Sequence, residues 1–398
     1  MIDSGFFKQN RARLIEAIDG GIAVLSSYDS MQLSGDEAVA FLQEANFWWL
    51  SGIEEPGWKI IIDGARGHTT LVKPHLSEIE QIFIGGLSRE QALSIAAADE
   101  VIDEQEFEQY LRKLTKQHTL VYEVFEKENY GFVMNPAQKN LSSVLHRLFP
   151  SVQSCLKQLR ELRAVKQPEE IAAIKKAIQL TCETFEKAKE QLDTFAHEYE
   201  LVALYDYEFR RHNATHAYSP IVANGAHACT MHYAANSGRL VKNKMTVIDI
   251  GARLHGYCAD ITRTYAVNPT KRQQRVHEVV QAAQRRIVAL LAPELPVSEY
   301  INRSDEIMKE ALEELGLLSD RSDIKTFRKY YPHATSHGLG VDVHDSLGAP
   351  RYFRAGMVLT VEPGIYIPEE NIGVRIEDNI LITSTGNENL SATLSTKW

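Results

Sequence analysis

Five potential metal ligands lie in the second half of this 398-residue chain, each in an apolar strand-like run or a glycine-rich turn. An ionised carboxylate is rarely buried unless it is paired or binds a metal, so such a group needs a physical reason. Four carboxylates and one imidazole together bring about four negative charges, which is enough for two divalent cations. The five residues are Asp249, Asp260, His337, Glu362 and Glu377.

The two aspartates indicate which chemistry such a site would perform. Asp249 and Asp260 are separated by Gly251 and Gly256, and a bend at residues 254–256 would place them on two antiparallel strands. Carboxylate-rich sites suit hard ions such as Mn²⁺ or Mg²⁺, and an added imidazole shifts the preference toward Mn²⁺, Co²⁺, Fe²⁺ or Zn²⁺. Two such ions can share a water molecule, lower its pKa and polarise a carbonyl group. The expected reaction is therefore hydrolysis of an amide or an ester.

Two further histidines, His232 and His344, are candidates for catalysis or substrate binding. His344 follows His337 closely, and His232 precedes the first aspartate in the run Cys-Thr-Met-His-Tyr. A pKa near neutrality suits either side chain for proton transfer or for binding a substrate carbonyl. Taken alone, each histidine fits a structural role equally well.

A C-terminal domain predicted over residues 156–398 must position these residues. Its first long helix is expected to begin at Pro168, with Glu169 and Glu170 near its positive end. All five ligands lie at or near predicted strands and none lies on a long helix, so we expect a sheet to hold the site. The helices are predicted at 168–190, 198–213, 270–291 and 298–315, and the strands at 219–223, 229–233, 245–250, 256–267, 357–361, 364–367 and 374–382.

A separate α/β domain is predicted over residues 1–155, and it carries no catalytic motif. Apolar runs and turn residues predict strands at 22–26 and 119–124 and a hairpin formed by 58–63 and 68–73. A capping box at Ser88 and a proline at residue 136 predict the starts of two helices.

The composition limits the class of protein. A formal net charge of −10 without any basic run argues against a nucleic-acid partner. The sequence has no apolar run long enough for a membrane span and no hydrophobic leader at its N-terminus, so we expect no membrane partner and a cytoplasmic protein. The 4 scattered cysteines fit free thiols in a reducing compartment.

Four segments resemble a known family. Residues 333–345, His-Ala-Thr-Ser-His-Gly-Leu-Gly-Val-Asp-Val-His-Asp, resemble the signature of the proline-specific metallopeptidases, the aminopeptidase P and prolidase group. Residues 357–366 and 373–379 are similar to later motifs of that family, and residues 43–52 to the N-terminal domain of bacterial aminopeptidase P. The resemblance implies an α/β (α+β) protein, in which a creatinase-like N-terminal domain precedes a pita-bread catalytic domain. It also implies a homodimer.

The resemblance also implies a centre of two divalent ions, usually Mn²⁺, with Co²⁺ or Zn²⁺ as alternatives. Carried over by position, Asp249 would chelate one ion and Asp260 and Glu377 would bridge both. His337 and Glu362 would bind the second ion, and Glu362 would take the proton from the attacking water.

The remaining assignments concern residues around the metals. By the same resemblance, His232 and His344 would hold the substrate and either stabilise the tetrahedral intermediate or protonate the proline nitrogen. Arg375 and Tyr366 match positions that orient the ligands. An arginine in the loop before Glu362 would grip a substrate carboxylate, and this loop offers two candidates, Arg351 and Arg354.

The activity implied is hydrolysis of the Xaa-Pro bond at the N-terminus of a proline-containing peptide by a hydroxide that bridges the metals. The alternative is a prolidase, which accepts dipeptides only, and the N-terminal domain would decide between the two by how it covers the site. Methionine aminopeptidase shares the five-ligand pattern, and a non-catalytic peptide-binding relative would have lost ligands. Both are more remote alternatives.

Overall fold

The chain forms two compact units that follow each other in sequence. The computed structural model describes residues 2–125 and 133–397. The first unit spans Met1–Leu162 and the second spans Arg163–Trp398. The division falls somewhat beyond the predicted boundary at residue 155, because most of helix α7 (Leu156–Ala164) belongs to the first unit.

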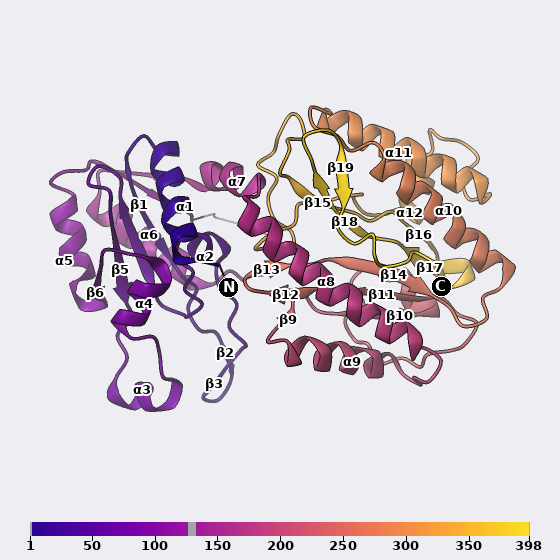
Figure 1. Cartoon of the computed structure of the whole chain (residues 1–398), viewed down its shortest axis with the longest axis horizontal. Helices are drawn as coiled ribbons and strands as arrows, with labels where there is room; N and C mark the ends of the chain where they lie inside the picture. The colour runs from indigo at the N-terminus through magenta and orange to yellow at the C-terminus, as the bar shows by residue number, and fades with distance from the viewer. Residues whose placement is uncertain (1, 126–132, 398) are drawn as a thin grey trace. The chain divides into compact units, whose positions relative to one another are not determined.

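The first unit, drawn in indigo to magenta in Figure 1, is built around a mixed six-stranded sheet with the order β6-β5-β4-β1-β7-β8. Helices α5 (Glu104–Leu114) and α6 (Pro136–Leu148) cover it with apolar side chains, among them Leu111 and Leu145, which pack in one core with Val24 and Ile61 of the sheet. Strands β4 and β5 form the predicted hairpin. The sheet strands are β1 (Ile22–Ser26), β4 (Lys59–Asp63), β5 (His68–Lys73), β6 (Glu100–Asp103), β7 (Leu120–Glu123) and β8 (Ser151–Ser154).

Two helices of the first unit begin where the sequence predicts them to. Helix α4 starts after Ser88, whose side chain accepts a hydrogen bond from the main chain of Gln91, and α6 starts at Pro136. A small hairpin, β2 (Gln32–Ser34) with β3 (Glu37–Ala38), lies outside the main sheet. The helices are α1 (Ser4–Ala17), α2 (Ala45–Ser51), α3 (Glu78–Ile84), α4 (Arg89–Ala96), α5 (Glu104–Leu114) and α6 (Pro136–Leu148).

The second unit consists of two halves with the same order of elements. Each half has two long helices followed by two antiparallel strands, between which a hairpin is inserted. The first half contains α8 (Pro168–Glu190), α9 (Glu198–Arg211), β10 (Ile221–Asn224), β11 (Thr246–Ile250), the hairpin β12 (Ala252–Leu254) and β13 (Tyr257–Cys258), and β14 (Ile261–Tyr265). The short strand β9 (Thr215–His216) pairs with β12.

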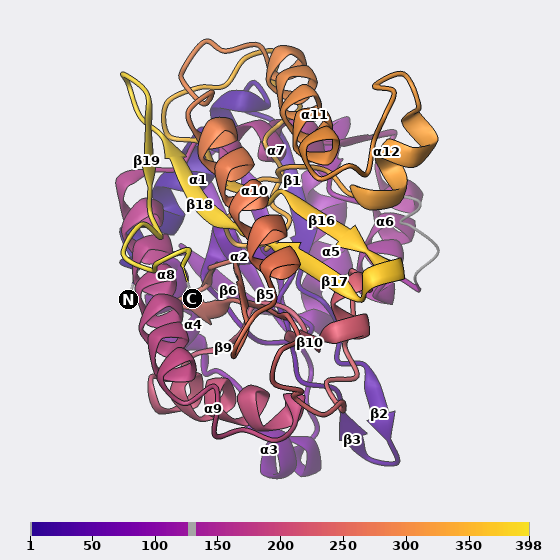
Figure 2. The same ribbon diagram turned by 90° about the vertical axis from the view of Figure 1, so that its right-hand side faces the viewer.

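The second half repeats this pattern. It contains α10 (Lys271–Val288), α11 (Val297–Glu314), the short helix α12 (Ile324–Tyr330), β15 (Val358–Val361), the hairpin β16 (Gly364–Ile367) and β17 (Ile372–Arg375), β18 (Asp378–Ile382) and β19 (Asn387–Asn389). Strand β11 pairs with β14, and β15 pairs with β18. Helix α10 lies against the β16–β17 hairpin (Figure 2). The four long helices thus back the strands, as predicted.

Three predicted strands are wrong in detail. The strands predicted at 256–267 and 374–382 are each broken, at residues 259–260 and 376–377, because the chain leaves the inserted hairpin there and enters a different ladder. The strand predicted at 229–233 is absent. A 3-10 turn, η1 (Gly225–Cys229), opens at Gly225 with a φ of +60°, and residues 230–233 after it form neither helix nor strand.

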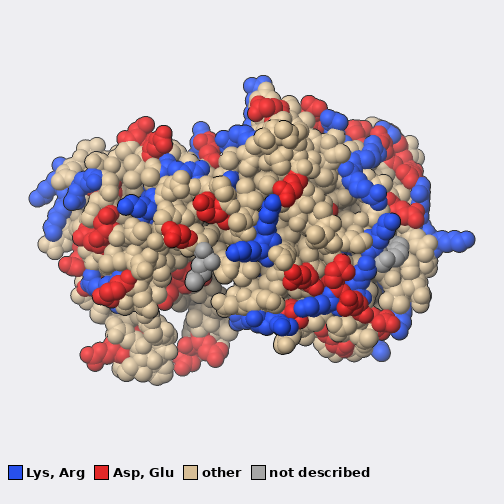
Figure 3. Space-filling view, in the orientation of Figure 1, with Lys and Arg blue, Asp and Glu red and all other residues tan. Residues whose placement is uncertain are grey.

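The surface carries both charge signs. On the face shown in Figure 3, acidic and basic side chains are interspersed over both units. Among the residues that the structure describes, no helix is both long and apolar enough to cross a bilayer.

The break before Asp260 depends on a glycine. A Cβ at Gly251 would lie 1.7 Å from the carbonyl oxygen of Ala259, so only glycine lets the two main-chain segments meet. We therefore expect Gly251→Ala to destabilise the protein by about 2–3 kcal/mol through backbone overpacking. Urea unfolding followed by circular dichroism measures this change.

The matched control is Gly386→Ala. A Cβ at Gly386 would meet no atom within 4 Å, so this substitution is expected to change stability by less than about 0.5 kcal/mol. Equal stability of the two variants would contradict the steric argument.

Candidate metal centre

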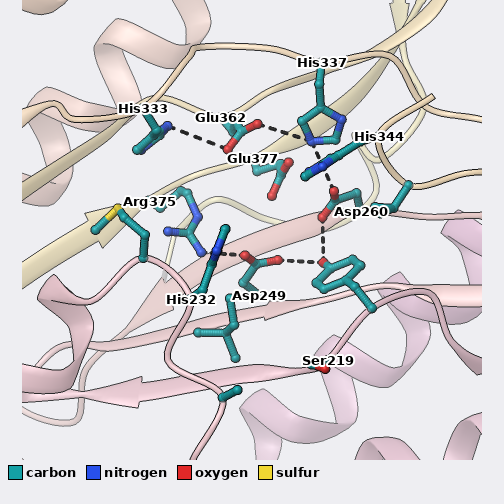
Figure 4. Close-up of a pocket in the computed structure, with 15 residues that line it drawn as sticks. Ser219, His232, Asp249, Asp260, His333, His337, His344, Glu362, Arg375 and Glu377 are labelled. Carbon is teal, nitrogen blue, oxygen red and sulfur yellow. Dashed lines mark hydrogen bonds and ion pairs between the residues drawn. The ribbon is translucent and has the colours of Figure 1, made fainter. Parts of the chain in front are cut away.

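The five predicted ligands converge on one cavity of about 410 Å³ in the second unit (Figure 4). Asp249 lies within β11, and Asp260 directly precedes β14. Glu362 directly follows β15, and Glu377 directly precedes β18. The two halves of the unit thus contribute a carboxylate pair each from equivalent places. His337 lies in the loop before β15 and completes the set.

Hydrogen bonds between the halves hold two of these carboxylates. The side-chain oxygen of Asn379 accepts from the main-chain N–H of Asp260 at 3.2 Å, and its amide group donates to the Asp260 carbonyl. The main-chain N–H of Glu377 donates to the carbonyl of Thr262 at 3.0 Å. The guanidinium of Arg263, 1% exposed, donates to the Glu377 carbonyl at 2.6 Å. Both carboxylates therefore project from rigid main chain.

His337 is oriented by its own loop. Its main-chain N–H donates to Thr360 at 3.1 Å, and its Nδ1 lies 3.0 Å from the carbonyl oxygen of Gly338. Donation from Nδ1 to that carbonyl leaves Nε2 free to act as a ligand. Nε2 faces Asp260 Oδ2 at 3.4 Å and Glu362 Oε1 at 3.3 Å.

The crowding of carboxylates disfavours their ionised forms. Burial, followed by the charges of neighbouring carboxylates, raises the pKa of Glu377 well above its usual range. Burial also raises the pKa of Glu362, to about 7, and that of Asp249. Burial alone would lower the pKa of His337, but its contact with Asp260 raises it to about 9. Bound cations would favour the opposite protonation states.

A buried oxygen without a donor shows that these residues fit a cation. Oε2 of Glu377 accepts a hydrogen bond from Thr262 at 2.6 Å, whereas Oε1 is buried and has no hydrogen-bond partner in the described part of the chain. Ligand atoms of Asp260, His337 and Glu377 all lie within 4.8 Å of one another. An orphaned carboxylate oxygen beside other ligands matches a metal site.

Arg375 and Tyr366 lie where the resemblance places them, beside the ligands. The guanidinium of Arg375 donates to Asp249 Oδ2 at 2.5 Å and to the hydroxyl of Tyr366 at 2.9 Å. The Tyr366 hydroxyl in turn lies 2.8 Å from His333 Nε2, and His333 Nδ1 lies 3.8 Å from Glu362 Oε2. This chain of contacts links Asp249 to Glu362 around the cavity.

Two residues of the site, His333 and Tyr218, were not predicted from the sequence. His333 belongs to the quoted motif, so its position could have been noticed. Tyr218 carries no motif, yet its hydroxyl lies 2.6 Å from oxygens of both Asp249 and Asp260. Burial and these carboxylates raise the pKa of Tyr218 well above its usual value, so it stays a donor.

Because the hydroxyl orients both aspartates, we expect Tyr218→Phe to weaken Mn²⁺ binding by about tenfold to a hundredfold. Calorimetric titration with Mn²⁺ measures the affinity. Tyr205→Phe is the matched control, because the buried Tyr205 hydroxyl has no hydrogen-bond partner among the described residues. An unchanged affinity in Tyr218→Phe would contradict an orienting role.

The other predicted residues separate into two groups. His232 and His344 both line the cavity, and the ring of His344 lies 4.2 Å from that of His337, centroid to centroid. Burial lowers the pKa of His344. Arg351 and Arg354 are exposed and are not among the residues that line the cavity.

Comparison with known proteins decides the family. Residues 172–384 match the model of metallopeptidase family M24, and residues 7–122 match the N-terminal domain of aminopeptidase P. The chain belongs to the aminopeptidase P group of metallopeptidase family M24.

Relatives of the M24 aminopeptidase P group match nearly the whole chain. The Xaa-Pro aminopeptidase of Haemophilus influenzae is 32% identical over 97% of this chain and 94% of its own length. The structure of aminopeptidase P from E. coli superposes with a TM-score of 0.90 at 29% identity, covering 100% of this chain and 97% of the other. The Xaa-Pro dipeptidase of Pyrococcus furiosus is 33% identical but covers 59% of this chain and 65% of its own.

Proposed function

We propose that this protein is a metal-dependent Xaa-Pro aminopeptidase, which hydrolyses the bond between an N-terminal residue and a following proline. The observation that carries the proposal is that all five proposed metal ligands, together with His232 and His344, line one cavity within the region that matches metallopeptidase family M24. The full-length match to Xaa-Pro aminopeptidases supports it.

Asp249, Asp260, His337, Glu362 and Glu377 would hold two divalent cations, with Mn²⁺ as the proposed ion and Co²⁺ or Zn²⁺ as alternatives. When bound, the cations lower the pKa of a shared water molecule and polarise the scissile carbonyl. Reconstitution of metal-free protein with each ion in turn, followed by activity and metal analysis, tests the choice. The homodimeric state is likewise a proposal that follows from the resemblance.

The chain's own side chains would then manage protons and orientation. The carboxylate of Glu362 lies in the cavity between His333 and His337 (Figure 4). There it can accept the proton that the attacking water releases. His232 and His344 both line the cavity, His344 beside His337. They are placed to donate hydrogen bonds to the substrate carbonyl or a proton to the proline nitrogen.

The electrostatics of the cavity favour peptides longer than two residues. A dipeptide presents its C-terminal carboxylate inside the site, where a cation must balance it. Among the described residues that line the cavity, the only arginine or lysine is Arg375, which already donates to Asp249, Tyr366 and Thr262. Since Arg351 and Arg354 lie outside the lining, the described residues of the cavity offer the carboxylate of a dipeptide no further arginine or lysine.

Hydrolysis of Ala-Pro-Ala, Ala-Pro and Met-Ala by the Mn²⁺-loaded protein tests the proposal. We expect cleavage of Ala-Pro-Ala with release of alanine and at least about tenfold lower kcat/KM for Ala-Pro. Preference for Ala-Pro would establish the dipeptidase, and cleavage of Met-Ala alone would establish a methionine aminopeptidase. Absence of hydrolysis with fewer than about one bound Mn²⁺ per chain would establish a non-catalytic relative.

A further inference from the structure

Buried charged side chains, and not contacts of His344 itself, fix the loop that carries His344. Val343 and His344 line the cavity, and the His344 side chain is exposed to it. Among the described residues His344 has a ring contact with His337 but no hydrogen-bond partner. Its position therefore depends on the main chain of the loop.

Asp345, the next residue, points the other way into a buried ion cluster. Its Oδ1 accepts from Arg163 at 2.9 Å, and its Oδ2 accepts from the ammonium of Lys166 at 3.1 Å. The side chains of Asp345 and Lys166 are 2% and 1% exposed. Arg163 also reaches Asp342 at 3.0 Å, so both aspartates of the loop share this cation.

The loop is closed tightly over this cluster. The main chains of Gly338 and Asp345 form an antiparallel bridge, with the Asp345 N–H donating to the Gly338 carbonyl at 2.9 Å. A Cβ at Gly340 would lie 2.0 Å from Asp345 Oδ2 and 2.9 Å from Lys166 Nζ. The Lys166 ammonium also donates to the Arg163 carbonyl at 2.5 Å. Only one arrangement of the loop therefore satisfies all of these contacts.

Stability alone does not account for the cluster. Removing charges from water costs several kcal/mol each, and a buried ion pair is often no more stabilising than apolar side chains of the same volume. What the ion cluster does provide is a fixed orientation of Asp345, because a carboxylate that is held at both oxygens cannot rotate. The fixed orientation of Asp345 in turn restrains the position of the neighbouring residue, His344.

We propose that Asp345, Arg163 and Lys166 are positioning residues, which fix the loop so that His344 meets the substrate in the geometry needed for catalysis. The inference rests on the proposed function, in which His344 contacts the substrate. It assigns to the three residues no contact with the substrate or with the metals.

A double-mutant cycle tests the coupling between Lys166 and His344. Lys166→Met keeps the length of the side chain and removes its charge, and it is measured in the wild-type and His344→Ala backgrounds with Ala-Pro-Ala. We expect kcat/KM to fall about tenfold in the wild-type background and less than about twofold in His344→Ala, because coupled residues are not additive. The Mn²⁺ content per chain is expected to stay unchanged.

The control is Lys187→Met, which removes another lysine from an ion pair, with Glu208 at 2.6 Å, in the same unit but outside the cavity lining. It should change kcat/KM by less than about twofold in both backgrounds. Equal losses for Lys166→Met in the two backgrounds, or no loss at all, would overturn the proposal. If Lys166→Met does not fold, Asp345→Asn takes its place in the cycle.

A second measurement is independent of activity and separates this inference from the proposed function. In protein with ¹³C-labelled histidine, the ring signal that disappears in His344→Gln identifies His344. We expect this signal to shift or broaden in Lys166→Met and to stay unchanged in Lys187→Met. An unchanged His344 signal in Lys166→Met would overturn the positioning role. Failure of the wild-type protein to cleave any Xaa-Pro peptide would overturn only the function proposed above.

Discussion

Asp260→Ala is expected to lower kcat/KM on Ala-Pro-Ala by about a thousandfold while leaving the protein folded. Asp260 lies at the centre of the site, 3.4 Å from His337 and 2.6 Å from the Tyr218 hydroxyl. Its removal takes away a ligand that both cations are proposed to share. It also removes a negative charge that, after burial, helps to raise the pKa of Glu377, so the metal-free protein should not lose stability.

Three measurements check this prediction: steady-state kinetics with Mn²⁺, metal content per chain, and thermal unfolding of the metal-free protein. Asp206→Ala is the matched control, because Asp206 accepts a hydrogen bond from His216 at 2.8 Å on the exposed surface of the same unit. It should leave kcat/KM within about twofold of the wild type. Retention of more than about one per cent of activity by Asp260→Ala would contradict the two-cation assignment.

Glu362→Gln is expected to lower kcat by about a hundredfold to ten-thousandfold with little change in KM. Glutamine keeps the shape of the side chain and one oxygen as a ligand, but it cannot accept a proton from the attacking water. A loss in kcat therefore reports the proton transfer, whereas a loss of metal would report ligation. Kinetics at saturating Mn²⁺, together with metal analysis, separate the two effects.

The control for this variant is Glu369→Gln. Glu369 forms an exposed ion pair with Lys329, so the substitution should change kcat by less than about twofold. If Glu362→Gln bound no Mn²⁺, its lost activity would report a ligand rather than a proton acceptor. If it kept full activity, another group would have to accept the proton.

Much of the fold was predictable from local patterns. The starts of α4, α6 and α8 were visible as a capping box or a proline at the first turn, because these signals act within one helical turn. The β4–β5 hairpin followed from its apolar runs and central glycines. Helix α11 is followed by Gly316, which has a φ of +72°, a conformation that glycine adopts readily after a helix.

The errors arose where long-range pairing overrides local pattern. Residues 256–267 and 374–382 are each rich in β-branched and other apolar residues, so each was predicted as one strand, yet each divides its pairing between a hairpin and a sheet. The strand predicted at 229–233 fails because the buried carboxylate of Glu198 accepts hydrogen bonds from His227 and Tyr233 and holds this segment as a curved loop. Such a partner, 29 to 35 residues away, leaves no local signature.

The sequence by itself determined which groups could bind metal, because the residue types and the motifs around Asp249, Asp260, His337, Glu362 and Glu377 are local properties. Only the tertiary structure decided what surrounds them. Thr262 reaches Glu377 across 115 residues, and Asn379 reaches Asp260 across 119, while Tyr218 joins two aspartates without any motif. The same held for Arg351 and Arg354, neither of which is among the residues that line the cavity. The physical reason is that the charge state and direction of a buried carboxylate depend on burial and on hydrogen-bond partners, and folding brings both from distant parts of the chain.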